Sequence, residues 1–245
     1  MDSTQDKVKR VRAALERHPL VNLHRFPMDL RAEGDELVLE GEVEDIAAKR
    51  VARLVATTEF GIDGVRDELR VAPAESRGDG AIAADVERAL KEEPAFRDYL
   101  MTARDGAPEP PARTTEVRQR GVISAAVADG VVTLHGAVES LSHERLAGVL
   151  AWWTRGVRNV ASHLRVLPEE RDTDEEVTDA LRLVLEKDPA LDAGNIAVEV
   201  RDHRVTLRGS VAGDEQWRLA NRDAWYLSGV QDVENLLEVR PGMGG

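Results

Sequence analysis

Val205-Thr-Leu-Arg-Gly-Ser-Val211 has two counterparts in the chain, Val132-Thr-Leu-His-Gly-Ala-Val138 and Leu37-Val-Leu-Glu-Gly-Glu-Val43. From the leucine two residues before the glycine of each stretch, the three copies align without a gap over 33 residues, and ten of these columns are identical in all three. For residues this common, a column matches threefold by chance about once in a hundred times. The sequence therefore predicts a triplicated domain.

The repeat predicts three domains near residues 1–75, 78–168 and 170–241. The 245 residues exceed the usual size of one domain, and three units of about 75 residues can each bury a small core. The distance from a shared proline to the glycine of the opening stretch is 42 residues in the second copy, against 22 and 20 in the others. An insertion at about residues 98–119 explains this, and we expect an irregular, proline-rich excursion there that is a candidate partner contact.

Each copy begins with apolar residues at helical spacing, and the helix is expected to end before Pro19, Pro94 or Pro189. Two runs with period-two alternation follow, such as Ile123–Val127 and Val132–Leu134, and they predict a β-hairpin. The residues between the runs tolerate the positive φ of a two-residue turn. These turn pairs are Gly34-Asp35, Asp129-Gly130 and Asp202-His203.

A second helix and a third strand complete each copy. Alanines four residues apart place one helix face close to the sheet, and the third strand should run parallel to the second through a right-handed crossover. The fold class is therefore α+β, with three tandem α-β-β-α-β domains, each a three-stranded mixed sheet with two helices on one face. Six glycines are assigned structural roles, for close backbone approach in Gly41, Gly136 and Gly209 and for a helix cap in Gly61, Gly156 and Gly229.

The composition narrows the function classes. The net charge of −13 repels nucleic acid and anionic membranes at long range, so no nucleic-acid partner is expected. With no cysteine, thiolate chemistry and cysteine-bound metals are excluded. The acidic N-terminus does not resemble an export signal, and no stretch approaches 18 apolar residues, so we expect a cytoplasmic protein without a transmembrane segment.

The combination of a proline-ended helix, Val-Thr-Leu-x-Gly-x-Val, Gly-Val-x-x-Val and a final Leu-x-Val resembles the BON domain, named for bacterial osmotically inducible and nodulation proteins. The resemblance is strong in the second and third copies and weaker in the first. It implies a small α/β module without catalytic machinery, which binds phospholipid or other ligands and is often linked to envelope or osmotic stress.

Candidate catalytic and metal-binding residues are few. None of the six histidines recurs at an equivalent place in the repeat, and no His-Glu-x-x-His is present. Ser140 and Ser142 lie beside His143, but neighbours in sequence seldom form the geometry of a triad, and we interpret the serines as the start of a helix. We therefore predict no enzyme activity, no catalytic residue, no cofactor and no metal site.

Aromatic residues are the candidates for contact with a partner or ligand. Trp152-Trp153 and Trp225-Tyr226 occupy the same two columns of the repeat, where the first copy has Thr57-Thr58. They either fill the core and a domain interface or present a rim to a partner or a membrane surface. The full set is Trp152, Trp153, Trp217, Trp225, Tyr226 and Tyr99.

Two function classes remain open. The first is a non-enzymatic binding or scaffold protein in stress or envelope-related physiology, which contacts a lipid, a small ligand or a protein. The alternative is a cytoplasmic sensor of potassium or a small molecule, because related proteins that join this domain to another module bind potassium, and backbone carbonyls can hold that ion without a sequence signature. An oligomer is compatible with both.

Overall fold

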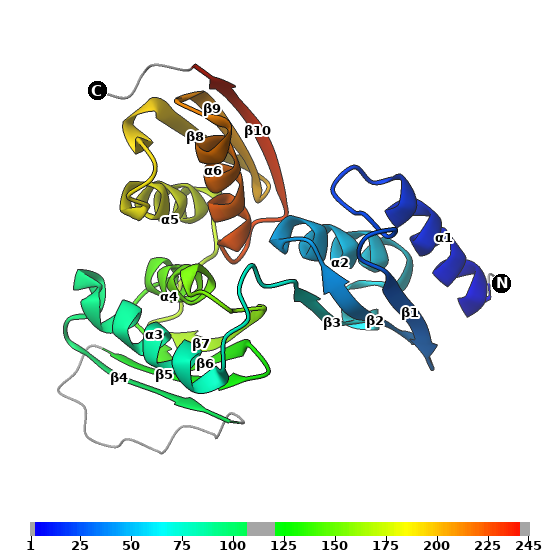
Figure 1. The fold of residues 1–245 in the computed structure, drawn as a ribbon, viewed down its shortest axis with the longest axis horizontal. Coiled ribbons are helices and arrows are strands. Elements are labelled where there is room, and N and C mark those ends of the chain that lie inside the picture. The colour runs from blue at the N-terminus through cyan, green and yellow to red at the C-terminus, as the bar shows by residue number, and fades with distance from the viewer. Residues whose placement is uncertain (1–2, 107–120, 241–245) are drawn as a thin grey trace. The chain divides into compact units, whose positions relative to one another are not determined.

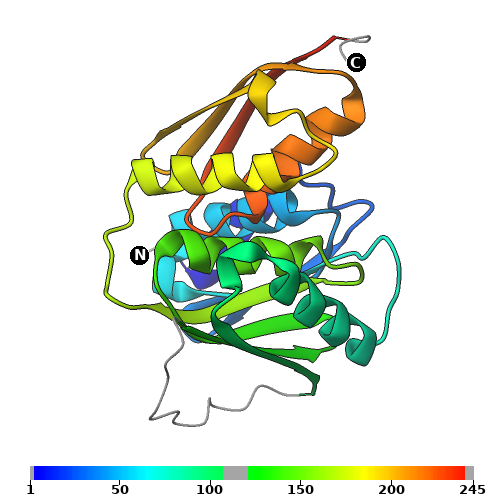
Figure 2. The same cartoon turned by 90° about the vertical axis from the view of Figure 1, so that its left-hand side faces the viewer.

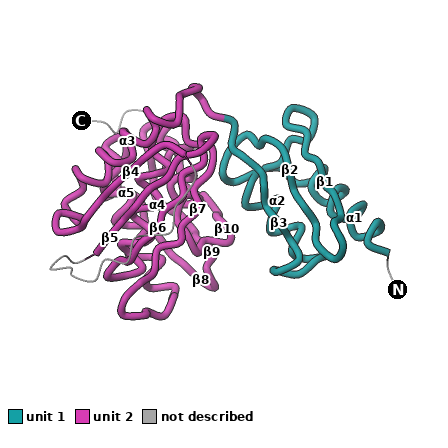
Figure 3. Tube along the Cα trace, turned by 90° about the horizontal axis from the view of Figure 1, so that it is seen from below, with its two compact units in different colours: residues 1–72 teal, residues 73–245 magenta. Residues whose placement is uncertain are grey.

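The computed structural model describes residues 3–106 and 121–240. Its contacts divide the chain into two compact units, Met1–Ala72 and Pro73–Gly245 (Figure 3). The first unit contains the first copy of the repeat, and the second unit contains the other two. The limits predicted for the three separate domains stay a prediction.

The elements of each copy follow the predicted order, with short 3-10 turns added (Figure 1). The first copy consists of α1 (Thr4–Arg17), β1 (Met28–Glu33), β2 (Glu36–Val43), α2 (Ile46–Phe60), η1 (Ile62–Gly64) and β3 (Val65–Val71). The second consists of α3 (Asp79–Glu92), η2 (Pro94–Phe96), β4 (Tyr99–Asp105), β5 (Gly121–Ala128), β6 (Val131–Val138), α4 (Leu141–Trp153) and β7 (Asn159–Val166). The third consists of α5 (Asp174–Lys187), η3 (Ala193–Asn195), β8 (Ile196–Arg201), β9 (Arg204–Val211), α6 (Asp214–Tyr226) and β10 (Asp232–Val239).

The sheets confirm the predicted fold class. In each copy the hairpin strands pair antiparallel, as β1 with β2, β5 with β6 and β8 with β9. The crossover strand then pairs parallel with the second hairpin strand, as β3, β7 and β10 do. The chain is therefore an α+β protein with three repeated α-β-β-α-β units, each built on a three-stranded mixed sheet.

The second sheet gains a fourth strand that the sequence did not predict. β4 lies in the segment that was expected to be irregular, and it pairs parallel with β5 at the edge of the sheet. Tyr99 and Met101 point to the buried side and alternate with the exposed Leu100, so the start of the insertion has the period of a strand. The proline-rich part of the insertion, residues 107–120, lies outside the described residues.

Of the helices α1 to α6, four begin at a side-chain cap, and α3 and α5 are hydrogen-bonded to the hairpin turn of their copy. Ser140 begins α4 as its N-cap, because its Oγ accepts the amide of His143, and this confirms the interpretation of the serines as a helix start. Asp79 and Asp174, the first residues of α3 and α5, each accept both amides of a hairpin turn at 2.8–2.9 Å. Backbone donors lower the pKa of Asp174 in this way.

The core of each copy lies between the sheet and its two helices. The repeated alanines are fully buried, as predicted, so the second helix of each copy can lie close to the strands. In the second unit, α3 to α6 lie between the two sheets, and the opposite face of each sheet is free of helices (Figure 2). The open face of the third sheet is the candidate site.

Candidate functional site

The open face of the third sheet carries charged side chains in rows across the strands. Strand alternation buries every second residue of β8 and β9, so the residues between them point away from the helices. Thr206 is at the centre, between Glu199 on β8 and Glu234 on β10. We call this surface the third face, with Ala197, Glu199, Arg201, Arg204, Thr206, Arg208, Asp232, Glu234 and Leu236 as its members.

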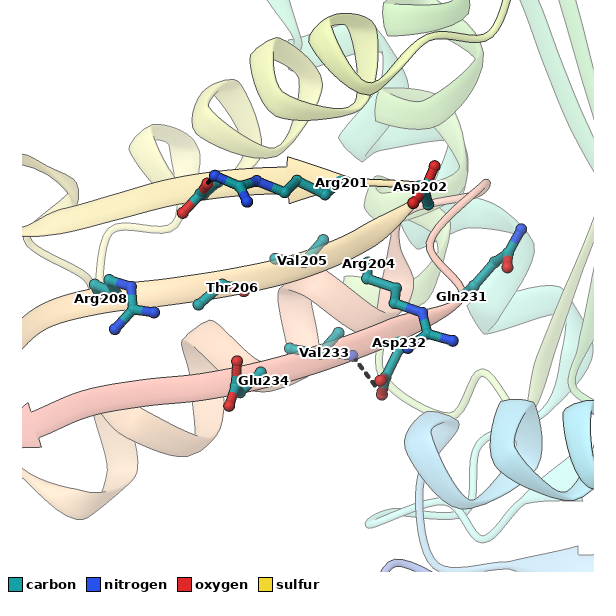
Figure 4. A pocket seen from close by; sticks show the side chains of 11 residues that line it. Arg201, Asp202, Arg204, Val205, Thr206, Arg208, Gln231, Asp232, Val233 and Glu234 are labelled. Carbon is teal, nitrogen blue, oxygen red and sulfur yellow. Dashed lines mark hydrogen bonds and ion pairs between the residues drawn. The ribbon is translucent and has the colours of Figure 1, made fainter.

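A shallow hollow of about 920 Å³ covers much of the third face. Figure 4 shows Arg201, Arg204 and Arg208 on its floor, together with the carboxylates of Asp232 and Glu234. Arg201 pairs with Glu199 at 2.5 Å. Arg204 and Arg208 have no ion pair or side-chain hydrogen bond with any other described residue. Their guanidinium groups are therefore available to an external carboxylate or phosphate.

The third face has the properties of a binding surface. Each guanidinium group offers several fixed donors, whereas the hydroxyl of Thr206 has no histidine among the residues that line the hollow to act as its base. Within the described residues, no group of three or more His, Cys, Asp or Glu is placed to hold a metal ion. The arrangement can hold charged groups of both signs in a fixed pattern.

The aromatic candidates of α4 and α6 lie where the second and third copies meet. Trp152 stacks on Tyr226 with ring centroids 5.1 Å apart and an interplanar angle of 9°. The indole of Trp153 donates to Asp223 at 2.9 Å. Trp225 of α6 is 1% exposed. These four residues therefore contact other parts of this chain, and contact of their rims with an external partner stays a prediction.

The other two aromatic candidates have different surroundings. Trp217 is half-buried against the core of the third copy. Tyr99 is 7% exposed, stacks on His143 and accepts the amide of Glu139 through its hydroxyl at 3.1 Å. The structure thus places Tyr99 in the second copy and brings neither residue to the third face.

Two charged groups are buried where the second and third copies meet, and sequence patterns did not single out either. Arg145 of α4 is 1% exposed and donates to the carbonyl of Ser228 at 3.0 Å and to Asp172. Asp223 of α6 is fully buried, and burial raises its pKa to about 7. No hydrogen bond of normal geometry reaches its Oδ2 within the described residues, and the neighbouring carboxyl of Asp188 also raises the pKa. A charge at a helix position where the other copies carry Leu150 and Val55 was the available signal for Asp223.

Histidines form two local contacts. His135 and His163 are register partners on β6 and β7, and their rings stack 5.0 Å apart. Burial, with His163 as a second cause, lowers the pKa of His135. His143 lies 2.7 Å from the hydroxyl of Ser140 through Nδ1, within the helix cap.

The glycines predicted to be structural have left-handed or similar backbone conformations. Gly41, Gly136 and Gly209 have φ of +130°, +136° and +124°. A Cβ on Gly136 would lie 1.9 Å from the carbonyl oxygen of Val122, and the corresponding distances at Gly209 and Gly41 are 2.0 and 2.9 Å. Gly61 caps α2 directly, whereas Gly156 and Gly229 lie in the turns that follow α4 and α6.

No helix in the described part of the chain combines the length and apolar character needed to cross a membrane.

Comparison with known proteins identifies a family and distantly similar solved structures. No curated protein matches the chain. Two solved structures of CdsD, a structural protein of the type III secretion system of Chlamydia trachomatis, align at 13% and 14% identity, each with a TM-score of 0.25. The alignments cover 97% and 98% of this chain and 94% and 100% of those chains, the second of which is the C-terminal domain.

The BON domain model matches three regions, residues 4–73, 115–168 and 173–241. The first and third regions span the α-β-β-α-β units of their copies, whereas the second region begins after α3 and β4 and includes β5, β6, α4 and β7. Together the three regions include most of the chain. The match also includes the first copy, where the sequence motifs were weakest. The chain therefore belongs to the BON domain family and carries three tandem copies of the domain.

Proposed function

We propose that this chain is a non-enzymatic scaffold that binds a protein partner through the third face. The observation that carries the proposal is the pair Arg204 and Arg208, which point from the central strand of an open sheet without a partner among the described residues. Arginine binds carboxylates through two parallel hydrogen bonds, and surface arginines of this kind are frequent in protein interfaces.

The surroundings of the two arginines favour a protein over a lipid. Glu199, Asp232 and Glu234 lie in the same hollow, and they would repel a dense layer of anionic headgroups. A protein surface can present both signs of charge in a complementary pattern. Phospholipid binding, potassium sensing, a cytoplasmic location and a role in stress or envelope physiology stay predictions from the resemblance and the sequence.

The test compares two variants with the same net charge. Arg204→Glu with Arg208→Glu reverses the third face, whereas Arg182→Glu with Arg218→Glu changes exposed arginines of α5 and α6 that form only helical neighbour pairs. The immobilised full chain is exposed to lysate of the source cells, and bound proteins are identified by mass spectrometry. We expect proteins that the wild type and the α5/α6 variant retain and that the third-face variant loses.

Two further measurements separate the other ligand classes. Flotation with phosphatidylglycerol vesicles tests lipid binding, and a thermal shift with potassium chloride against sodium chloride tests ion binding. Equal protein capture by all three chains would contradict the proposal. Flotation that depends on Arg204 and Arg208 without protein capture would replace it with a lipid function.

A further inference from the structure

We infer that the third face binds a second copy of this chain, through the open face of the first sheet. This inference rests on the proposed function of the third face and names its partner. The open face of the first sheet, here the first face, consists of the residues of β1, β2 and β3 on the side away from the helices. Its charged residues are exposed or half-buried, whereas Val38 at its centre is fully buried and the equivalent Thr206 is half-buried. Its charged members near the centre are Arg31, Glu33, Glu36, Glu40, Arg66 and Glu68.

The two faces have the same geometry and opposite charges. Val38 at the centre of the first face is the repeat equivalent of Thr206, and each has two cross-strand neighbours. The neighbours of Val38 are Arg31 and Arg66, whereas those of Thr206 are Glu199 and Glu234.

The charges at equivalent positions also have opposite signs along the central strand and on the strands beside it. Glu36 and Glu40 of β2 correspond to Arg204 and Arg208 of β9. Every open-face position that is charged in both copies differs in sign. The six pairs are Arg31/Glu199, Glu33/Arg201, Glu36/Arg204, Glu40/Arg208, Arg66/Glu234 and Arg70/Glu238.

The ion pairs within the two faces also differ. On the first face the carboxylates outnumber the arginines, so two arginines share them: Arg66 contacts Glu33, Glu36 and Glu68, and Arg31 contacts Asp29, Glu33 and Glu40. On the third face Arg204 and Arg208 have no ion-pair partner among the described residues (Figure 4). The first face therefore has an excess of carboxylates, and the third face offers two arginines that form no ion pair within the described residues.

Stacking the faces with their strands aligned brings these groups opposite one another. Aligned sheets pack face to face with strand directions within about 30°. The central strands β2 and β9 then lie over each other, which places Glu36 and Glu40 opposite Arg204 and Arg208.

The outer strands exchange sides in this arrangement because one sheet is turned over. Arg31 then lies opposite Glu234, and Arg66 lies opposite Glu199. Glu33 opposite Asp232 is a like-charge contact, at the edge of the stack.

Contact between two identical faces would instead bring like charges together. About a two-fold axis along the central strand, Glu40 would lie on Glu40 and Arg208 on Arg208. Like charges in direct opposition suppress such pairing. The contact is therefore heterologous, first face to third face, and such contacts build rings or open chains of molecules.

The association should be weak, because exposed ion pairs contribute little individually and the net charge of −13 repels a second molecule. At an ionic strength of about 0.15 M, repulsion is screened beyond roughly 8 Å, while contacts within the interface are less affected. We therefore expect a dissociation constant between about 1 μM and 1 mM.

Sedimentation equilibrium of the full chain over a range of concentrations tests the inference. We expect concentration-dependent association of the wild type. Glu36→Arg with Glu40→Arg, and separately Arg204→Glu with Arg208→Glu, should each raise the dissociation constant about tenfold or more. The chain with all four substitutions should associate again, because its charge pattern is exchanged and still complementary.

Mixing the two double variants gives the sharpest result. Each variant alone should associate about tenfold or more weakly than the wild type, but each supplies a face that complements one on the other, so the mixture should associate more strongly than either variant alone. The variant with Arg182→Glu and Arg218→Glu carries the same net charge as the third-face variant and should behave as the wild type. Circular dichroism checks that every variant is folded.

Three results would overturn the inference: a wild type that stays monomeric to about 1 mM, an equal loss in the α5/α6 variant, or a mixture that does not associate. A monomeric wild type whose third-face variant still loses cellular partners would refute self-association and leave the proposed function standing. If the third-face variant changes neither capture nor sedimentation, the proposed function fails as well.

Discussion

The first copy of the BON domain forms a compact unit alone, whereas the second and third copies form one unit together. The copies differ in two columns of the second helix, among other positions. In α2 these columns hold Thr57 and Thr58, whose hydroxyls bond back to carbonyls of their own helix at 2.7 Å. In α4 and α6 they hold aromatic pairs, and Trp152 stacks on Tyr226. Two helix positions thus distinguish copies that join from one that does not.

Tryptophan fluorescence can follow this difference, because all four tryptophans lie in residues 73–245. Their emission reports on the second and third copies, while circular dichroism reports on all three. Denaturation of the full chain can therefore assign a loss of stability to one unit. The predictions below use this separation.

The largest effect is expected from alanine at the repeated strand glycine. Gly136→Ala and Gly209→Ala would place a Cβ about 2 Å from a backbone oxygen at positive φ, so each should lower the free energy of unfolding by about 3 kcal/mol or more. A Cβ on Gly41 would lie 2.9 Å from the carbonyl oxygen of Pro27, so Gly41→Ala should lower the free energy of unfolding by less. A loss below about 1 kcal/mol at Gly136 or Gly209, measured by fluorescence, would contradict this.

Removal of Arg145 should separate the joined copies. Arg145→Met leaves the carbonyl of Ser228 without its donor in a buried place and should lower the stability of residues 73–245 by about 2–4 kcal/mol. Arg218 occupies the same column of the third copy but is exposed, so Arg218→Met should change stability by less than about 0.5 kcal/mol. Equal losses in urea denaturation would show that the interface does not depend on Arg145.

Asp223 should make the joined unit less stable as the pH rises. Its pKa is about 7 in the folded chain, against an ordinary value of 3.8. Between these values the folded state holds a proton that the unfolded state has lost, so stability falls with rising pH and levels off above the window. The slope from this group is at most about 1.4 kcal/mol per pH unit.

Asp223→Asn isolates this contribution, because an amide oxygen can still accept from Trp153. We expect the difference in unfolding free energy between variant and wild type to change between pH 5 and pH 7, in the direction that favours the wild type at low pH. Parallel stability curves, measured by fluorescence in urea, would mean that Asp223 does not bind a proton in this range.

The smallest effect is expected from the hydrogen bonds between the first residue of each copy's first helix and the amides of the hairpin turn. Asp79 and Asp174 accept these hydrogen bonds in the second and third copies, and the equivalent residue of α1 is Thr4. Thr4→Asp should add about 0.5 kcal/mol by accepting amides of the turn at Gly34 and Asp35. Hydrogen exchange at these two amides should become slower, and Asp174→Asn should accelerate exchange at Asp202 and His203. Unchanged exchange in Thr4→Asp would show that the turn of the first copy is placed differently.

Much of this protein could be predicted from local sequence. Apolar spacing, turn residues and the repeat gave the order of elements and the buried alanines, because these depend on neighbours within about 30 residues. The strand β4 was missed because it lies in the insertion of the second copy, where the repeat gives no guide, and its alternation covers only Tyr99 to Met101 before polar residues follow.

The sequence by itself determined three BON copies and the charges on their strands, because strand alternation fixes which residues share a face. Only the tertiary structure decided that Trp153 meets Asp223 and that Arg145 is buried, because these partners are about 70 and 80 residues apart and no local pattern links them. The same holds for the two faces: each residue was visible in the sequence, but strand register was needed to place Arg31 and Arg66 around Val38, and Glu199 and Glu234 around Thr206.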